Sequence, residues 1–567
     1  MRKNHLSLAV TAALLAGAQG AHAAYTSATV PDLEIYISGA SAQDKGIDLM
    51  IRNYLQVNDA NLIKFIDNGT AAGTQVGSAQ TAWTFTLDKT KVSGLTFTGS
   101  AAGGNPIVTV HKFSSGGSFN GVGPILGDNP LNVPKTLNYM VINGTNCGAD
   151  NRCATSGTGA TLAKVPDLGV ADVNTEMFKG LNVPSGTTAP PVAKASALVN
   201  EREAAGLVFG IIVNNNLYNA LQNAQIASGR IVAPAGGCPQ AAQTGGNASF
   251  LPSAGGTSPV SGYGTSVGDD TCMPSLSKAQ VTALMSGDVK SWEKIQVVDT
   301  ANVKKPLTDA AYDTPALPAV FPTSGIFGGV APVVHCTRSA GSGTKATANF
   351  VFLSAPCTAN AASPSSAYDV AAGPAVMLNS SSGGVESCLT DADNGTATTT
   401  DTAGHNVGAD YLGAKFWAFG IQSTESNAAL AKPYRFVKID GIAPTLKNTA
   451  EGKYIDWAEQ SFIWRKDYST GSWNTGTATQ KAARLAILTQ ITVSTGQPSV
   501  VSILNAGFNH GFGQAGVLAL TSNGYAQSIP FAPTNPVTAW THKTGTLLDN
   551  CRSPSHVTTD QTFDLDP

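Results

Sequence analysis

The stretch Val333–Leu353, VVHCTRSAGSGTKATANFVFL, decides the fold. It begins with apolar, β-branched residues that favour a buried strand. It continues through a turn of small residues, Ser339–Thr344, and ends in an apolar segment that closes at Leu353. A buried strand that leads through a tight turn into a helix is the repeating unit of layered α/β folds. We therefore predict a strand, a turn and a helix here.

The same order of strand, turn and helix recurs elsewhere in the chain, which predicts the α/β class for the whole protein. The units are the strand Leu33–Ile37 with the turn Ser38–Ala42 and a one-sided apolar helix Ile47–Leu55, the strand Ile107–Val110 with the turn Ser114–Ser118, and the strand Phe209–Asn214 with a helix through Leu217–Leu221.

The turn Arg338–Lys345 has the composition of an anion cradle. It offers small residues, hydroxyls and free backbone N–H groups at the start of a helix, whose dipole favours negative charge. Arg338 adds a guanidinium suited to bidentate contact with an oxyanion. The alternative is an ordinary N-capped helix with a surface arginine. The turn is not a Walker A loop, because Lys345 is followed by Ala346 and does not itself follow a glycine.

The N-terminus, residues 1–23, has the pattern of a signal peptide. Arg2 and Lys3 precede an apolar run, Leu6–Ala16, and Ala21-His22-Ala23 fits the A-x-A cleavage pattern. The run is shorter than the ~20 residues of a membrane helix, and the first cysteine is Cys147, so we expect no membrane anchor. The expected location is the periplasm of a Gram-negative bacterium, or outside the cell.

The amino-acid composition excludes one class of binding partner, nucleic acids. Charged residues make up 13% of the chain and the formal net charge is -3, which gives no electrostatic basis for nucleic-acid binding.

An oxidising compartment makes disulfides the expected state of the eight cysteines. Cys147 with Cys153, and Cys238 with Cys272, flank loop-like stretches and are expected to pair, whereas the other four allow three connectivities. A zinc site is the weaker alternative, because no C-x2-C pair occurs.

Signatures of catalysis are missing from the sequence. It contains neither G-x-S-x-G nor H-E-x-x-H, and no compact Ser, His and Asp arrangement, so we expect no enzyme, no catalytic residue, no metal and no cofactor. Gly511–Gly516 matches G-x-G-x-x-G, but the next acid is Asp549, too far to contact a ribose. A glycine-rich packing turn is the better interpretation.

Long stretches rich in Gly, Ser, Thr and Ala separate the α/β units. Their simplest interpretation is surface insertions held by disulfides on an enlarged scaffold. The alternative is a surface that binds a partner. These stretches are residues 66–105, 144–162, 233–272, 358–368 and 380–410.

Taken in order, seven short motifs resemble the phosphate-binding component of bacterial phosphate ABC transporters, a type 2 periplasmic binding protein of the PBP-like superfamily. They are Gly39-Ala40-Ser41-Ala42, Phe113-Ser114-Ser115-Gly116-Gly117, Asp167–Asn174, Leu276–Trp292, Arg338 with Ser342-Gly343-Thr344, Ala418-Phe419-Gly420-Ile421 and Ile439–Thr445.

The resemblance implies two α/β lobes that close on a ligand in the cleft between them. It divides the chain into the signal peptide 1–23, a first lobe at 24–207, a second lobe at 208–414, and a return to the first lobe with a C-terminal extension at 415–567. The long insertions would be disulfide-stapled additions to this fold.

The resemblance also implies the ligand-binding residues. The first lobe would offer backbone N–H groups near Ala42 and Gln43, the Ser115 hydroxyl and the Asp172 carboxylate. The second would offer Arg338, Ser342, Gly343 and Thr344. A carboxylate acceptor among many donors selects an oxyanion that still carries a proton, because an anion without one would face bare repulsion.

This chain departs from the family pattern after its first turn, where Gln43 and Asp44 replace a threonine and an aromatic residue. An acid at a helix start competes with a bound anion for the same N–H groups. The alternative is that Asp44 caps the helix and points away from the cleft.

Two functions follow. The first is an exported solute-binding protein that captures phosphate or a related small oxyanion in the interlobe cleft and delivers it to an inner-membrane ABC permease. The second is a secreted surface or matrix protein that uses the same scaffold, with a vestigial ligand site and insertions that contact other macromolecules.

Overall fold

We analysed a computed structural model of the 567-residue chain. The predicted signal peptide, residues 1–23, lies outside the described residues. The structure describes residues 25–557 except 58–60, 69–78, 128–132, 189, 191–194, 236, 239–269, 314–316, 319, 324, 369–372, 429 and 546.

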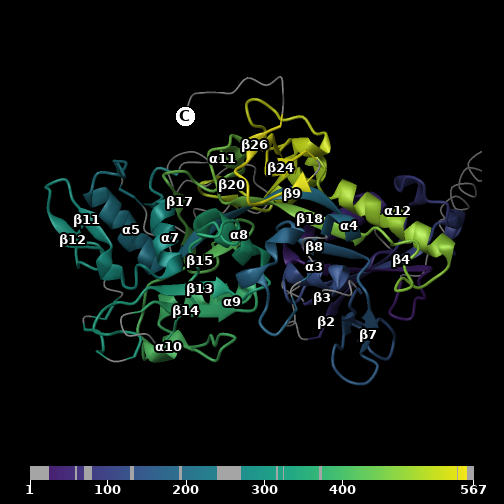
Figure 1. Ribbon diagram of the computed structural model, residues 1–567, viewed down its shortest axis with the longest axis horizontal. Helices are drawn as coiled ribbons and strands as arrows, with labels where there is room; N and C mark the ends of the chain where they lie inside the picture. The colour runs from purple at the N-terminus through teal and green to yellow at the C-terminus, as the bar shows by residue number, and fades with distance from the viewer. Residues whose placement is uncertain are drawn as a thin grey trace, which may run out of the picture.

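The protein has a mixed α/β fold of two lobes that share one long strand, β9 (Val199–Asn214). The N-terminal part of β9 pairs with β18 (Trp457–Arg465), and its residues Phe209 to Val213 pair with β15 (Ala418–Ser423). Figure 1 shows β9 running between the two halves of the elongated molecule. The change of partner at Phe209 lies next to the expected lobe limit at 207 and 208, and the remaining domain limits stay predictions.

The first lobe contains a sheet that continues outward from β9. Its inner strands run parallel to one another, and β3 and β18 run antiparallel to their neighbours. From β9 outward the strands are β18, β8 (Leu168–Ala171), β1 (Leu33–Gly39), β4 (Ile107–Phe113), β3 (Gln80–Thr86), β2 (Ile63–Asp67) and β6 (Arg152–Cys153).

The second lobe contains the other end of the sheet. Here β14 (Ala375–Asn379), β13 (Val334–Arg338) and β15 are parallel, and β16 (Tyr434–Phe436) pairs with the end of β9. The strand, turn and helix predicted for Val333–Leu353 are confirmed, because β13 leads through a turn into α8 (Gly343–Leu353). The strands predicted at Leu33, Ile107 and Phe209 are also present as β1, β4 and β9.

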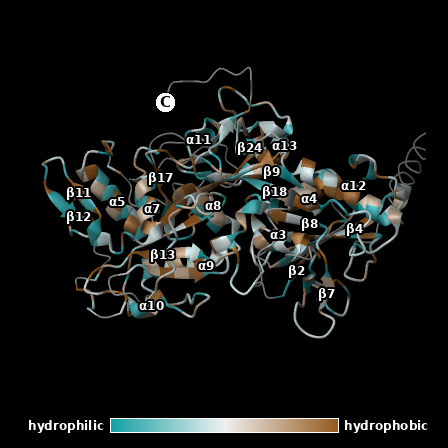
Figure 2. Ribbon diagram, viewed as in Figure 1, coloured by the Kyte–Doolittle hydropathy of each residue, from teal (hydrophilic) through white to brown (hydrophobic). Residues whose placement is uncertain are grey.

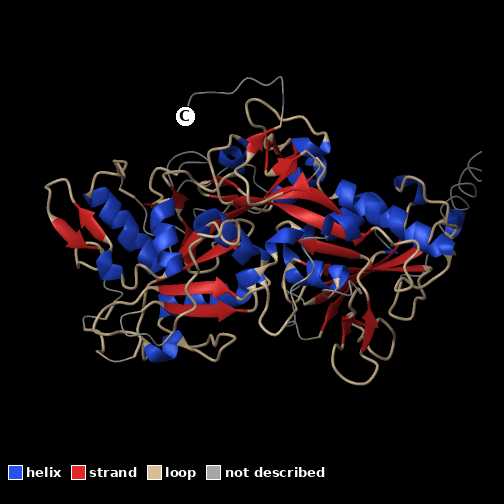
Figure 3. Ribbon diagram, in the orientation of Figure 1, coloured by secondary structure: helices blue, strands red, loops and turns tan. Residues whose placement is uncertain are grey.

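Helices flank the sheet in both lobes (Figure 3). In the first lobe α3 contacts β8, β1 and β18, and α12 contacts β1 and β9, whereas in the second lobe α8 and α9 both contact β13 and β15. The helices are α2 (Asp44–Met50), which continues as a π-helical turn Ile51–Leu55, α3 (Phe119–Leu126), α4 (Ala195–Leu198), α5 (Asn215–Ala227), α7 (Lys278–Ser286), α8, α9 (Ser382–Asn394), α10 (Val407–Asp410), α11 (Leu446–Ala450), α12 (Ala478–Ser494) and α13 (Pro498–Asn505).

One hydrophobic cluster runs through both lobes. It joins Phe119 and Phe178 of the first lobe to Val351 and Phe352 of α8. Hydrophobic residues follow the central strands, and α12 alternates between hydrophobic and hydrophilic residues (Figure 2), as expected of a helix with one face on the core. No helix in the described part of the chain combines the length and hydropathy needed to cross a bilayer.

All eight cysteines are paired. The two predicted loop staples, Cys147–Cys153 and Cys238–Cys272, are confirmed. Among the three open connectivities, the structure selects Cys336–Cys388, which ties β13 to α9, and Cys357–Cys551, which spans 194 residues of sequence.

The C-terminal extension folds as short strands over the junction of the two lobes (Figure 1). The apolar stretch before Gly511 is the helix α13, and a strand rather than a helix follows Gly516, so Gly511–Gly516 is a packing turn as interpreted from sequence. The short strands are β19 (Asn509–His510), β20 (Gly513–Gln514), β21 (Val517–Leu520), β22 (Val537–Thr538), β23 (Trp540–Thr541), β24 (Lys543–Thr544), β25 (Leu547–Leu548) and β26 (Ser555–His556).

Candidate functional site

The start of α8 presents unused hydrogen-bond donors. Ser342 caps the helix, and its hydroxyl accepts from the amide of Lys345 at 3.3 Å. The amides of Gly343 and Thr344 find no acceptor among the residues that the structure describes. Ser342 and Thr344 are both buried. Orphan N–H groups at a helix start, together with the helix dipole, attract anions.

Arg338 lies at the end of β13, one short turn before these amides. Its Nη1 donates to Ser382 Oγ at 2.9 Å and its Nη2 to the Ser380 carbonyl at 3.1 Å, while its buried Nε has no partner in the part of the chain that the structure describes. Burial lowers the pKa of Arg338 to about 10, a shift that the Asp172 carboxylate opposes. The guanidinium therefore stays charged at neutral pH, and its Nε donor is unused among the described residues.

Asp172 lies across the lobe boundary from α8, directly after β8. Ser118 Oγ donates to its Oδ2 at 3.2 Å and accepts from the Asp172 amide at 3.1 Å, and Gln460 Nε2 donates to Oδ1 at 3.4 Å. Burial raises the pKa of Asp172, although these hydrogen bonds and the charge of Arg338 act against the rise. The carboxyl group therefore takes up a proton more readily than an exposed aspartate.

The two lobes meet directly at this point. The Phe119 amide donates to the Gly341 carbonyl at 2.9 Å, and the Gly341 amide donates to the Asn182 carbonyl at 3.0 Å. A Cβ atom on Gly343 would lie 2.3 Å from Ser118 Oγ and 2.6 Å from Asp172 Oδ2. Only glycine allows the backbone of α8 to approach the first lobe this closely.

Gln43 reaches Asp172 through a second glutamine. The Gln43 side chain is buried, and its Nε2 donates to Oε1 of Gln460. Gln460 in turn donates from its Nε2 to Asp172. Ala42, the preceding residue, lies partly buried against the main core. Gln43 therefore supports the Asp172 carboxylate through its side chain.

Asp44 forms an ion pair inside the first lobe. Its Oδ1 lies 3.1 Å from the Nζ of Lys112, and its Oδ2 accepts from Ser114 Oγ at 2.7 Å. Lys112 is fully buried and also donates to the carbonyls of Gly39 and Ala40, each at 3.0 Å. The interpretation of Asp44 as a helix cap is wrong, because Gln43 is the N-cap residue of α2 and the Asp44 carboxylate pairs with the buried lysine. This pairing neutralises the acid that would otherwise repel an anion.

Ser115 lies apart from these groups. It is exposed, and its carbonyl accepts from Asn120 Nδ2 at 2.9 Å. Ser118, three residues later, provides the hydroxyl that touches Asp172. The structure therefore brings together Gln43, Asp172, Arg338, Ser342, Gly343 and Thr344 and leaves Ser115 outside this group.

Sequence reasoning missed four residues of the site: Lys112, Ser118, Glu425 and Gln460. Glu425 is a further acid near Asp172 and Asp44, and burial raises its pKa to about 7 against the attraction of Lys45. Ser118 stood within the predicted turn and could have been found there. Lys112 could have been suspected as a charge within an apolar strand, whereas nothing in the sequence near Glu425 or Gln460 points to this site.

A polar cavity of about 340 Å³ adjoins the residues that hold Arg338. Ser380, whose carbonyl accepts from Arg338, forms part of its wall. Its other lining residues are Asn379, Gly384, Ser387 and Thr398–Thr402.

Comparison with known proteins finds similarity of fold alone. No protein-family model matches the chain, and no curated protein matches its sequence. Several solved structures resemble it in fold, including the following three. A protein from Clostridium perfringens, described as a phosphate ABC transporter substrate-binding protein with bound phosphate, has 14% identity and a TM-score of 0.28, with 60% of this chain and 78% of that chain covered.

The other two are an ABC-type phosphate transport receptor from Vibrio cholerae and PstS from Borrelia burgdorferi. The first has 13% identity, a TM-score of 0.25 and coverage of 57% of this chain and 74% of its own. The second has 9% identity, a TM-score of 0.24 and coverage of 60% of this chain and 78% of its own. Because these TM-scores are below 0.5, we base the function on this chain's own residues.

Proposed function

We propose that this protein captures a small oxyanion that carries a proton, with phosphate as the first candidate, between its two lobes. The observation that carries the proposal is the set of unused donors beside a protonatable acid. Among the described residues, the amides of Gly343 and Thr344 and the buried Nε of Arg338 have no acceptor. Gly343 packs against Asp172, whose pKa is raised by burial against the opposing charge of Arg338.

Each residue has a separate role in this proposal. Arg338 neutralises the anion, and the amides at the start of α8 hold its oxygens. One proton lies between Asp172 and a ligand oxygen, because two bare anions would repel each other. Ser118 and Gln460 orient the Asp172 carboxylate, and Gln43 holds Gln460 in place. Export to the periplasm and delivery to an ABC permease stay predictions.

The second candidate is a surface or matrix protein with a vestigial ligand site. The observation in its favour is that the lobes touch directly through Phe119 and Gly341 and are joined by the Cys357–Cys551 bond. This candidate predicts that no oxyanion stabilises the folded protein.

Thermal unfolding of the dialysed mature protein distinguishes the two. Phosphate, arsenate, sulfate and organic phosphates are each added, and the organic phosphates test whether the polar cavity beside Arg338 accepts a substituent. Ligand at 100 times its Kd stabilises the folded state by ~2.7 kcal/mol, which shifts the Tm by several degrees. We expect a shift with phosphate that Arg338→Ala abolishes and that the exposed-arginine control Arg230→Ala retains. A flat response to every oxyanion would refute the proposal.

A further inference from the structure

The C-terminal extension is anchored to both lobes at once. We infer that residues 537–545 and 547–557 form a clamp that holds the lobes closed over the candidate site, so that a ligand enters and leaves slowly while the clamp is intact. The effect on ligand exchange rests on the proposed function. The clamp itself rests only on contacts within this chain.

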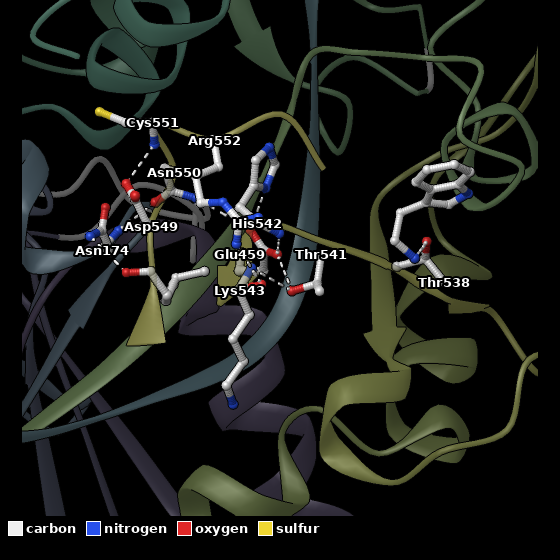
Figure 4. Close-up of polar contacts among 12 residues, drawn as sticks. Asn174, Glu459, Thr538, Thr541, His542, Lys543, Asp549, Asn550, Cys551 and Arg552 are labelled. Atoms are coloured by element: carbon white, nitrogen blue, oxygen red, sulfur yellow. Dashed lines mark hydrogen bonds and ion pairs between the residues drawn. The ribbon is translucent and has the colours of Figure 1, made fainter. Parts of the chain in front are cut away.

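The first anchor is the buried Glu459 of β18, in the first lobe. It accepts hydrogen bonds from Thr541 Oγ1 at 2.8 Å, from the amide and Nδ1 of His542 at 2.7 Å each, and from Asn550 Nδ2 at 3.2 Å. Figure 4 shows these groups converging on Glu459. A fully buried carboxylate with four donors fixes the extension in one position.

The second anchor is Asn174, which follows β8 and lies two residues after Asp172. Its amide donates to Asn550 Oδ1 at 2.7 Å, and its Nδ2 donates to the Leu548 carbonyl at 3.1 Å (Figure 4). Lys543 adds an ion pair with Glu203 of β9. The extension is therefore attached to the strands that carry the first-lobe half of the site.

The third anchor lies in the second lobe and is covalent. Cys551 is bonded to Cys357, four residues after α8 ends. The ring of His542 also meets the ring of Phe350 on α8, with 5.8 Å between centroids. Since α8 has only 11 residues, its C-terminal end is held by the clamp within about 17 Å of the donors at its N-terminal end.

Separation of the lobes must therefore move α8 against the clamp. Opening would break the bond from Phe119 to Gly341 and the bond from Asn349 Nδ2 to Asn182 Oδ1, which measures 2.9 Å. The extension would have to stretch, or leave Glu459 and Asn174, for this motion to proceed. With Cys357–Cys551 intact, opening is coupled to the loss of buried hydrogen bonds.

The test compares two double variants by amide hydrogen exchange without ligand. Cys357→Ser/Cys551→Ser removes the covalent anchor, and Cys147→Ser/Cys153→Ser removes a local staple as a matched control. In Cys357→Ser/Cys551→Ser, we expect amide exchange to be about tenfold faster in the peptide that contains Phe119 and in the peptide that contains Gly341. We expect no such change in the control variant. Asn550→Ala, which leaves every disulfide in place, should act in the same direction if the first variant folds poorly. Unchanged exchange in both Cys357→Ser/Cys551→Ser and Asn550→Ala would overturn the clamp.

Phosphate exchange provides the second readout. We expect the dissociation rate of inorganic phosphate to rise about tenfold or more in Cys357→Ser/Cys551→Ser, with the control unchanged. If Cys357→Ser/Cys551→Ser binds phosphate and releases it at the native rate, the clamp does not control the entry and exit of the ligand. If no variant binds phosphate but the exchange of Phe119 and Gly341 responds, the clamp stands and the proposed oxyanion function fails.

Discussion

The amide of Phe119 donates a hydrogen bond to the carbonyl of Gly341, with 2.9 Å between the two atoms. Phe119 begins α3 in the first lobe, and Gly341 belongs to the turn before α8 in the second. The turn before α3 and the turn before α8 are therefore in contact, and under the proposed function a ligand is held beside this bond.

Gly343→Ala should push the start of α8 away from Ser118 and Asp172. The new Cβ would overlap Ser118 Oγ and Asp172 Oδ2, and overpacking of this kind costs about 1–3 kcal/mol. We expect a lower Tm and weaker phosphate binding. The control is Gly144→Ala, whose Cβ meets no atom within 4 Å. Equal Tm and equal affinity for the two variants would contradict close packing at Gly343.

Asp172→Asn should change which anion binds. The amide can donate to a fully ionised oxyanion, whereas the native carboxyl group requires a shared proton. We expect weaker phosphate binding and stronger sulfate binding, measured by calorimetric titration. In the native protein, phosphate should bind more tightly than sulfate at neutral pH, because the phosphate ion still carries a proton to share with Asp172 and sulfate carries none. Equal native affinities for phosphate and sulfate would contradict this role.

Asp456 should make the protein less stable as pH rises. Burial raises the pKa of this carboxyl group to about 7, and neither of its oxygens has a partner among the described residues. Between its unfolded and folded pKa values only the folded state holds the proton, so stability falls by up to about 1.4 kcal/mol per pH unit. Asp456→Asn should flatten the decline of Tm between pH 4 and 7, whereas the exposed control Asp288→Asn should not. A Tm profile unchanged by Asp456→Asn would contradict the prediction.

Glu459, three residues later, should act in the opposite direction. Its burial acts to raise the pKa, but the contacts with His542 and Thr541 outweigh burial and lower it. The stability that this carboxylate contributes is present above its unfolded pKa and is lost as pH falls through the lowered folded pKa. Glu459→Gln removes a buried carboxylate that accepts four hydrogen bonds and should cost about 1.5–3 kcal/mol at neutral pH, the range for hydrogen bonds to a charged group. Denaturant unfolding measures the loss, and a loss below about 1 kcal/mol would show that the network contributes little.

The elements that carry the site could be predicted because their signals are local. The strand, turn and helix of Val333–Leu353 follow from apolar patterning and small residues within 21 positions, and Ser342 is the helix cap that its position suggests. The Cys147–Cys153 and Cys238–Cys272 bonds also close loops that are visible in the sequence.

The partners of those elements could not be predicted, because they come from distant parts of the chain. Gln460 contacts Asp172 across 288 positions, and Cys551 meets Cys357 across 194. Asp44 shows the same limit in a single residue. The position of Asp44 at a helix start suggested a cap, but its carboxylate forms an ion pair with a buried lysine 68 positions away.

Equilibrium dialysis of labelled inorganic phosphate against the protein without its predicted signal peptide, after unfolding, dialysis and refolding with its disulfides intact, tests the central claim most directly. We expect one phosphate per chain and affinity at least about tenfold weaker in Arg338→Ala, because a charge-assisted hydrogen bond contributes about 1.5–3 kcal/mol. Arg230→Ala should bind as the native protein does. No bound phosphate, or binding that Arg338→Ala leaves unchanged, would contradict capture of the anion between Arg338 and Asp172.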